Sequence, residues 1–223
     1  MSRIQAEIQT IRQELPEGVR LVAVSKFHPI EALQEAYEAG QRIFGESKVQ
    51  EMTMKQEVLP KDIEWHFIGH LQTNKIKYMA SYVSLIHGVD SYKLLTEINK
   101  QAKKAERIIP CLLQIHIAQE ETKFGFTPKE CMAMLNEGAW RNLTHVQIAG
   151  VMGMATNTDD PTQVEAEFAS LSSLFLQIKE THFADIPYFK EISMGMSDDY
   201  PLAIRQGSTL IRIGSRIFGA RQY

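Results

Sequence analysis

Cysteine is scarce in this 223-residue chain, and the scarcity limits its chemistry. The two cysteines, Cys111 and Cys131, lack the close spacing that a metal site requires. Each lies within an apolar run, which is typical of a reduced, buried thiol in a cytosolic protein. We therefore expect a cytoplasmic protein and no cysteine-ligated metal.

Long apolar runs and concentrated positive charge are also missing. No stretch approaches the roughly 20 apolar residues of a membrane span, and the first residues lack the apolar core of a signal peptide. The net charge is −3, and the lysine-rich run at 100–104 is typical of a solvated helix face. We expect a soluble protein that neither enters a membrane nor binds nucleic acid.

The chain does contain enough apolar material for a large core, since 44% of its residues are hydrophobic and 23% are charged. No serine- or glycine-rich linker divides it, and no internal repeat is visible. The chain also stops shortly after the last predicted strand, which leaves no room for a second domain. These features predict a single domain over residues 1–223.

Apolar, β-branched runs alternate with helix-like stretches along most of the chain. The strand-like runs lie at 20–25, 42–44, 64–68, 83–89, 111–117, 146–151, 188–194 and 210–213. Prolines stand where helices should begin, at Pro29, Pro128, Pro161 and Pro201. Eight strands, with a helix after each of the first seven, imply right-handed βαβ units and a parallel sheet. We predict an α/β fold, a single closed (β/α)₈ barrel of the TIM type; the alternative is an open doubly wound sheet.

An additional helix precedes the barrel. Ser2 can cap it, and Ile4, Ile8 and Ile11 recur at helical spacing. The Pro-Glu-Gly sequence at 16–18 then ends it. We expect residues 1–15 to pack on the outside of the barrel.

Barrels place their chemistry at the C-terminal ends of the strands. Lys26 ends the first strand, and alternation puts it on the same face as Val22 and Val24. Burial at the rim disfavours the charged amine, which makes it nucleophilic toward aldehydes. The alternative is a lysine whose amine simply extends from the rim into water.

Glycine and serine follow the seventh and eighth strands, as Gly195 with Ser197 and as the Gly214-Ser215 turn. Barrels often hold a phosphate in these two loops. Each pattern alone is common in ordinary turns, but together they stand beside Lys26, because the eighth strand of a barrel neighbours the first. This combination predicts a site that holds the phosphate of an aldehyde and captures its carbonyl.

Arg212 is the other unusual residue, because alternation directs it into the barrel with Gly214. A buried arginine keeps its charge and needs an acceptor. A pyridine nitrogen would serve; the alternative is an internal salt bridge to Glu191 or Asp198. Asp198 and Asp199 suit the start of a helix, and since adjacent carboxylates point in different directions we expect no metal there.

Seven segments of the chain carry a family resemblance. They are Ala23-Val24-Ser25-Lys26, Phe44-Gly45-Glu46, 65–75, Lys123-Phe124-Gly125, Gly150-Val151-Met152, 193–199 and 212–221. Together they resemble the pyridoxal 5′-phosphate (PLP) homeostasis protein family, the alanine-racemase-like YggS family. One departure is Ser47, where the family commonly has asparagine, so no contact of that asparagine is carried over.

The resemblance implies a barrel of the alanine racemase kind (fold type III) with PLP held as a Schiff base on Lys26. It implies phosphate contacts from Ser197 and the Gly214-Ser215 turn, with Arg212 facing the pyridine nitrogen. The expected cofactor-binding residues are Lys26, His66, Met152, Met196, Ser197, Arg212, Gly214 and Ser215.

The resemblance further implies a role in intracellular PLP homeostasis without established catalytic turnover, with PLP-dependent apo-enzymes as partners. We expect a monomer and no ordinary enzyme. Enzymes that use PLP as a strong electron sink place a carboxylate beside the ring nitrogen, where this chain is expected to have Arg212. The related racemases tolerate an arginine beside the ring nitrogen. They resemble a barrel joined to a second β domain, and a tyrosine from the partner subunit acts as their second base. The alternatives are an amino-acid racemase with weak activity and a Schiff-base aldolase acting on a sugar phosphate.

Overall fold

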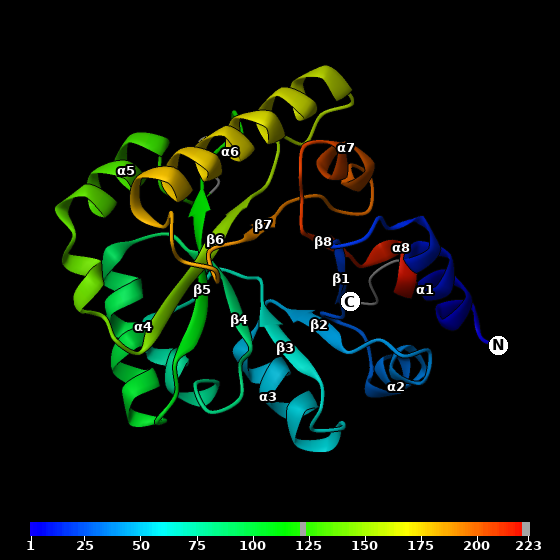
Figure 1. Ribbon diagram of the computed structural model, residues 1–223. Helices are drawn as coiled ribbons and strands as arrows, with labels where there is room; N and C mark the ends of the chain where they lie inside the picture. The colour runs from blue at the N-terminus through cyan, green and yellow to red at the C-terminus, as the bar shows by residue number, and fades with distance from the viewer. Residues whose placement is uncertain (121–123, 220–223) are drawn as a thin grey trace.

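Eight parallel strands form a closed barrel in the computed structural model, which describes residues 1–120 and 124–219. The strands follow one another in chain order, and β8 pairs with β1 to complete the ring (Figure 1). They are β1 (Arg20–Val24), β2 (Ile43–Glu46), β3 (Glu64–Phe67), β4 (Leu85–Val89), β5 (Ile109–Ile115), β6 (Val146–Gly153), β7 (Glu191–Ser193) and β8 (Leu210–Ile213). The predicted (β/α)₈ barrel is confirmed, and the open sheet is excluded.

Helices surround the barrel and cover its strands (Figure 1). They are α1 (Arg3–Glu14), α2 (Ile30–Glu38), α3 (Val49–Val58), η1 (Thr73–Tyr78), α4 (Tyr92–Lys104), α5 (Pro128–Glu137), η2 (Ala139–Asn142), α6 (Pro161–His182), α7 (Tyr200–Arg205) and α8 (Ser215–Phe218). The helix between β3 and β4 is the 3₁₀ helix η1. Ile76 is its buried residue, and Met79, which follows the helix directly, is buried three positions later, one 3₁₀ turn further on.

The N-terminal helix α1 lies against the C-terminal part of the barrel, beside α8 (Figure 1). Ser2 caps it, as the sequence predicts, and Ile8 and Ile11 are fully buried. Arg216 of α8 holds it from the other side through an ion pair with Glu14 at 3.0 Å. Apolar burial and this ion pair together attach α1 to the strands that carry the site.

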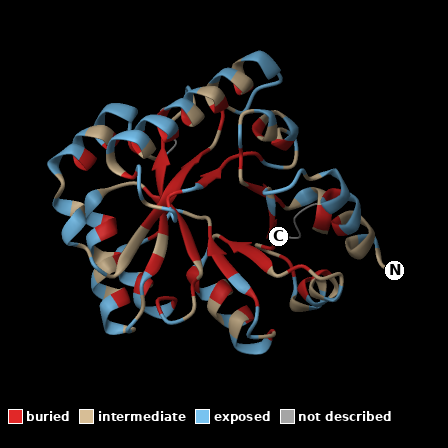
Figure 2. Cartoon of the chain, viewed as in Figure 1, coloured by how far each residue is buried: buried red, intermediate tan, exposed pale blue. Residues whose placement is uncertain are grey.

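The barrel interior is a packed core and not a pore. One apolar cluster fills its centre, formed by Val22, Ile43, Leu85, Leu112, Ala149, Met152 and Leu210. A larger cluster lies between the strands and the helices, while the outer faces of the helices are exposed (Figure 2). Each fully buried aliphatic side chain contributes roughly 1.5–3 kcal/mol to folding. In the described part of the chain, no helix has the length and apolarity needed to cross a membrane.

Candidate functional site

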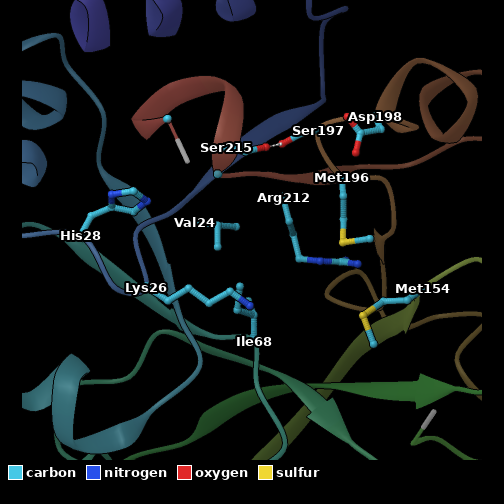
Figure 3. Close-up of a pocket in the computed structure, with 12 residues that line it drawn as sticks. Val24, Lys26, His28, Ile68, Met154, Met196, Ser197, Asp198, Arg212 and Ser215 are labelled. Carbon is cyan, nitrogen blue, oxygen red and sulfur yellow. Dashed lines mark hydrogen bonds between the residues drawn. The ribbon is translucent and has the colours of Figure 1, made fainter. Parts of the chain in front are cut away.

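A cavity of about 270 Å³ opens where β1 and β8 end (Figure 3). Its walls come from those strand ends and from the loops that follow β3, β6 and β7. The lining residues are Val24, Lys26, His28, Ile68, Met154, Met196, Ser197, Asp198, Arg212, Gly214, Ser215 and Gly219. The cavity therefore lies at the C-terminal ends of the strands, where barrels carry their chemistry.

Lys26 is directed into this cavity by the alternation of β1. Val22 lies in the apolar interior of the barrel, Val24 lines the cavity, and the Lys26 side chain extends from the same face (Figure 3). The next residue, Phe27, has a φ of 68°, so the chain turns sharply away from the strand direction immediately after the lysine. The strand therefore places the amine at the rim of the cavity, and the turn at Phe27 follows directly.

Arg212 reaches the same space from β8 and is almost wholly buried, with 4% of its surface exposed. Its Nη1 donates to Ser193 Oγ at 2.5 Å, and its Nη2 donates to the Gly153 carbonyl at 3.1 Å. Burial lowers the pKa of the guanidinium to about 10, while the nearby Asp199 carboxylate acts in the opposite direction. The arginine is therefore held by neutral oxygens at the base of the cavity.

The alternative partner Glu191 is already engaged elsewhere. It pairs with Arg20 at 2.6 Å, and Arg20 begins β1 at the opposite end of the barrel. The alternative of a salt bridge between Glu191 and Arg212 is therefore not observed, because Glu191 is paired with Arg20 and the bonds of Arg212 go to Ser193 and Gly153.

A chain of buried hydrogen bonds continues from Arg212 into the barrel. Ser193 Oγ lies 2.8 Å from His87 Nδ1, and His87 Nε2 lies 2.9 Å from His66 Nδ1. Because a guanidinium only donates, the serine hydroxyl accepts from Arg212, whereas the donors along Ser193–His87–His66 depend on the tautomers of the two imidazoles. Burial lowers the pKa of His66 to about 3 and that of His87 well below its ordinary value, so both rings are neutral.

The two serines predicted to bind phosphate meet at one side of the cavity. Ser215 Oγ donates to Ser197 Oγ at 3.0 Å; Ser215 is exposed and Ser197 is half-buried (Figure 3). The loop that carries Ser197 is fixed because the Met196 N–H donates to Asp199 Oδ1 at 2.5 Å. Gly195 has a φ of 92°, and a Cβ at this position would lie 2.6 Å from a side-chain atom of α7. Two hydroxyls, one on the loop after β7 and one at the start of α8, thus line the same cavity.

Six of the eight predicted binding residues line this one cavity: Lys26, Met196, Ser197, Arg212, Gly214 and Ser215. Met152 and His66 lie deeper, in the barrel interior. For the methionine the reason is strand length. β6 runs to Gly153, beyond the expected end at Val151, so Met154 is the residue that reaches the rim. The motif residues Lys123, Ala220 and Arg221 lie outside the described residues.

Sequence reasoning missed His28, Ile68 and Met154 as lining residues. The two-residue alternation of the strands could have identified them, because it directs every second side chain to the same face. His28 follows Lys26 by two positions, as Ile68 follows His66. The His28 ring also stacks on Phe218, with a centroid distance of 5.0 Å. No group of three or more potential metal-ligating His, Cys, Asp or Glu side chains occurs among residues 1–120 and 124–219.

The fold and the site together define a (β/α)₈ barrel protein in which a lysine, a buried arginine and two serines line one cavity at the C-terminal ends of the strands. The family described as "Alanine racemase, N-terminal domain" matches residues 1–222. The pyridoxal phosphate homeostasis protein of Pasteurella multocida is 39% identical over 231 residues, covering 100% of this chain and 97% of its own. That of Schizosaccharomyces pombe is 36% identical, covering 99% and 94%. The chain belongs to the pyridoxal phosphate homeostasis proteins, within the alanine racemase N-terminal domain family.

Solved structures agree with this assignment. PipY of Synechococcus elongatus without PLP superposes with a TM-score of 0.89 at 37% identity, covering 97% of this chain and 100% of that one. The structure of PipY with PLP bound gives a TM-score of 0.86 at 36% identity, with the same coverage. Alanine racemase from Bartonella henselae is 18% identical with a TM-score of 0.71, and this chain spans 59% of it. At that identity the racemase shows a shared fold alone.

Proposed function

We propose that this chain binds PLP through Lys26 and acts in PLP homeostasis. The observation that carries the proposal is the convergence of Lys26, Arg212, Ser197 and Ser215 on one cavity. Support also comes from PipY, which is similar over nearly the whole chain and whose structure has been determined with PLP bound.

The chemistry of the donor set fits PLP. An amine, a guanidinium and two hydroxyls surround one space, and PLP has an aldehyde, a ring nitrogen and a phosphate. When bound, PLP supplies a carbonyl that a lysine amine can capture and a ring that can delocalise charge. No acidic cluster surrounds the two serines: among the described lining residues, Asp198 is the sole carboxylate. The cavity is therefore suited to an anionic ligand.

Each residue has a distinct role in this proposal. Lys26 would supply the nucleophilic amine that captures the aldehyde. Ser197 and Ser215 would donate hydrogen bonds to the phosphate, held in place by their loops. The Met196–Asp199 bond keeps the first of these loops fixed before the ligand arrives. Such preorganisation reduces the ordering cost of binding.

Arg212 supports a holder of PLP over a catalyst. A guanidinium can donate to a ring nitrogen but cannot accept its proton, so the nitrogen would stay unprotonated. Strong electron-sink enzymes use a carboxylate at this place. The Ser193–His87–His66 chain behind the arginine is neutral, so it supplies no negative charge that would favour protonation of the ring nitrogen. We propose binding and release of PLP, without ordinary turnover, as the principal activity.

The same proposal extends to organisation and partners. We propose that residues 1–223 form one domain, with α1 as an outer helix, and that the protein acts as a cytoplasmic monomer. PLP-dependent apo-enzymes are the proposed recipients. Timed transfer of PLP from the loaded protein to an apo-enzyme, compared with free PLP, tests this last step.

The binding proposal is tested by reduction and peptide mapping. Purified protein is mixed with PLP, reduced with borohydride and digested, and the pyridoxyl adduct is located by mass spectrometry. We expect the main adduct on Lys26, and none there in Lys26→Ala, with unfolding curves that overlay. Lys93→Ala, an exposed lysine on α4, serves as the control. A main adduct on another lysine in the wild-type protein would refute the assignment.

A further inference from the structure

A buried charged cluster lies directly behind Lys26, on the side of the barrel wall that faces the helices. It consists of Glu46 at the end of β2 and Glu51 and Lys55 on α3, and we call it the Lys55 cluster. The side chains of Lys55 and Glu46 are 1% and 0% exposed. Lys55 Nζ lies 2.8 Å from Glu46 Oε1 and 2.7 Å from Glu51 Oε1. Two carboxylates thus accept hydrogen bonds from one buried lysine. None of these three residues is among those that line the cavity.

The Lys55 cluster is bonded to the residues on both sides of Lys26. The third proton of Lys55 Nζ goes to the Ser25 carbonyl at 2.8 Å, and Ser25 Oγ donates to Glu46 Oε1 at 2.6 Å. After the lysine, the Phe27 N–H donates to Glu51 Oε1 at 2.6 Å. The backbone is therefore held immediately before and immediately after Lys26 by the same cluster.

The bond to Phe27 holds a backbone conformation that the residue does not favour. Phe27 has a φ of 68°, in the left-handed region that disfavours large side chains. Such conformations persist where surrounding structure enforces them, and they gather at functional sites. Here the Glu51 carboxylate accepts the N–H of the strained residue itself. Because the turn begins at this residue, its conformation decides where the preceding Lys26 side chain points.

Burial of these charges is expensive, and stability alone does not explain it. Replacing buried ion pairs with apolar side chains is often neutral or stabilising. Part of the cluster is also left unsatisfied, because Glu46 Oε2 is buried without a hydrogen-bond partner in the described structure. What the cluster does achieve is geometric, since its bonds converge on the two residues that flank Lys26.

We propose that the Lys55 cluster is a positioning device for Lys26: it holds the Ser25–Phe27 backbone so that the amine stays in the cavity, ready to capture a carbonyl. Glu51 is the principal positioning residue because it accepts from Phe27. This inference rests on the proposed role of Lys26. It adds that capture of PLP depends on residues that lie outside the cavity and do not touch the ligand.

The test compares three variants on one helix. Glu51→Ala removes the acceptor of the Phe27 N–H, Glu51→Gln keeps an acceptor oxygen without the charge, and Glu57→Ala removes an exposed carboxylate of α3 as a matched control. We expect Glu51→Ala to slow capture of PLP by Lys26 roughly tenfold or more, as loss of a hydrogen bond to a charged group implies. Glu51→Gln should restore most of the rate, and Glu57→Ala should match the wild type. Thermal unfolding confirms that each variant is folded.

A second comparison separates positioning from a general charge effect. Glycine adopts a positive φ without strain, so in a Phe27→Gly background the Glu51→Ala change should slow capture less than about threefold. An undiminished tenfold effect in that background would overturn the proposal, because Glu51 would then act through its charge and not through the turn.

Hydrogen exchange of the PLP-free protein keeps this test independent of the proposed function. We expect the amides of residues 25–28 to exchange at least about tenfold faster in Glu51→Ala and unchanged in Glu57→Ala. Absence of PLP capture in the wild-type protein would refute the binding function, and exchange would still decide whether the cluster holds the turn. Unchanged exchange, or faster exchange with unaltered capture, would overturn the positioning role.

Discussion

The guanidinium of Arg212 and the hydroxyl of Ser193 are joined by a 2.5 Å hydrogen bond between the adjacent strands β8 and β7. The same hydroxyl is bonded to His87, and through it to His66, across the barrel interior. Arg212 lines the cavity, whereas Ser193 and the two histidines do not. How the arginine is presented to a ligand therefore depends on a serine that no ligand in the cavity would touch.

Ser193→Ala should destabilise the protein. The change removes an acceptor from a buried guanidinium and a hydrogen-bond partner from His87, and such losses cost about 1–3 kcal/mol. Urea unfolding measures the difference. Ser173→Ala, on the exposed face of α6, removes a hydroxyl bonded only within its own helix and should change stability far less. Equal effects of the two changes would show that the bond to Arg212 contributes nothing specific.

Ser197→Ala and Ser215→Ala should each weaken binding of PLP but not of pyridoxal. The hydroxyls are expected to donate to the phosphate, and a hydrogen bond to a charged group contributes roughly 1.5–3 kcal/mol. Pyridoxal lacks the phosphate and serves as the matched ligand. Titration of the wild-type protein and both variants with each compound makes the comparison. If both ligands lose affinity equally, the serines act through the loop structure and not through the phosphate.

Stability should fall as the pH drops below about 6.5. In the folded protein burial lowers the pKa of His66 from 6.5 to about 3 and that of His87 well below 6.5, so the unfolded chain binds protons that the folded chain excludes. The stability that these neutral histidines provide is complete above the unfolded pKa and declines toward acid pH. The slope reaches about 1.4 kcal/mol per pH unit for each histidine.

Glu46 acts in the opposite direction, because burial raises its pKa from 4.5 to about 6. Its contribution is present below pH 4.5, is lost as the pH rises through about 6, and partly offsets the histidines. Unfolding in urea at a series of pH values measures the net slope. His66→Gln should give a shallower decline in acid. A slope identical to that of the wild type would contradict a neutral, buried His66.

Exchange of the α-proton of alanine separates a holder of PLP from a racemase. Loss of this proton needs both an electron sink and a positioned base, whereas exchange of an amine at the bound carbonyl needs neither. We therefore expect the loaded protein to incorporate solvent deuterium into L- and D-alanine many orders of magnitude more slowly than a racemase control. Incorporation in the ordinary enzymatic range of about 1–10³ s⁻¹ would establish the racemase alternative instead.

Local patterns in the sequence were sufficient to predict the barrel and to bring the lysine, the arginine and the two serines to one site. The alternation of strands and helices predicted a closed parallel sheet, because the hydrophobic period of each run indicates a strand or a helix without information from the rest of the chain. The two-residue period of β1 directed Lys26 inward, and the same rule applied to Arg212 on β8. The glycine–serine loops placed Ser197 and Ser215 together because barrel closure makes the loops after strands seven and eight neighbours.

Tertiary structure alone decided how these residues are held. The bond between His87 and Ser193 joins positions 106 residues apart, and Lys55 reaches Ser25 across 30 residues. Neither pair follows from a local period, because each depends on which side chains meet after the barrel closes and α3 packs on its wall. The same is true of the lowered pKa of His66, which arises from burial. Burial is a property of the packed molecule, so the Lys55 cluster and the histidine chain emerge only when the strands and helices are assembled.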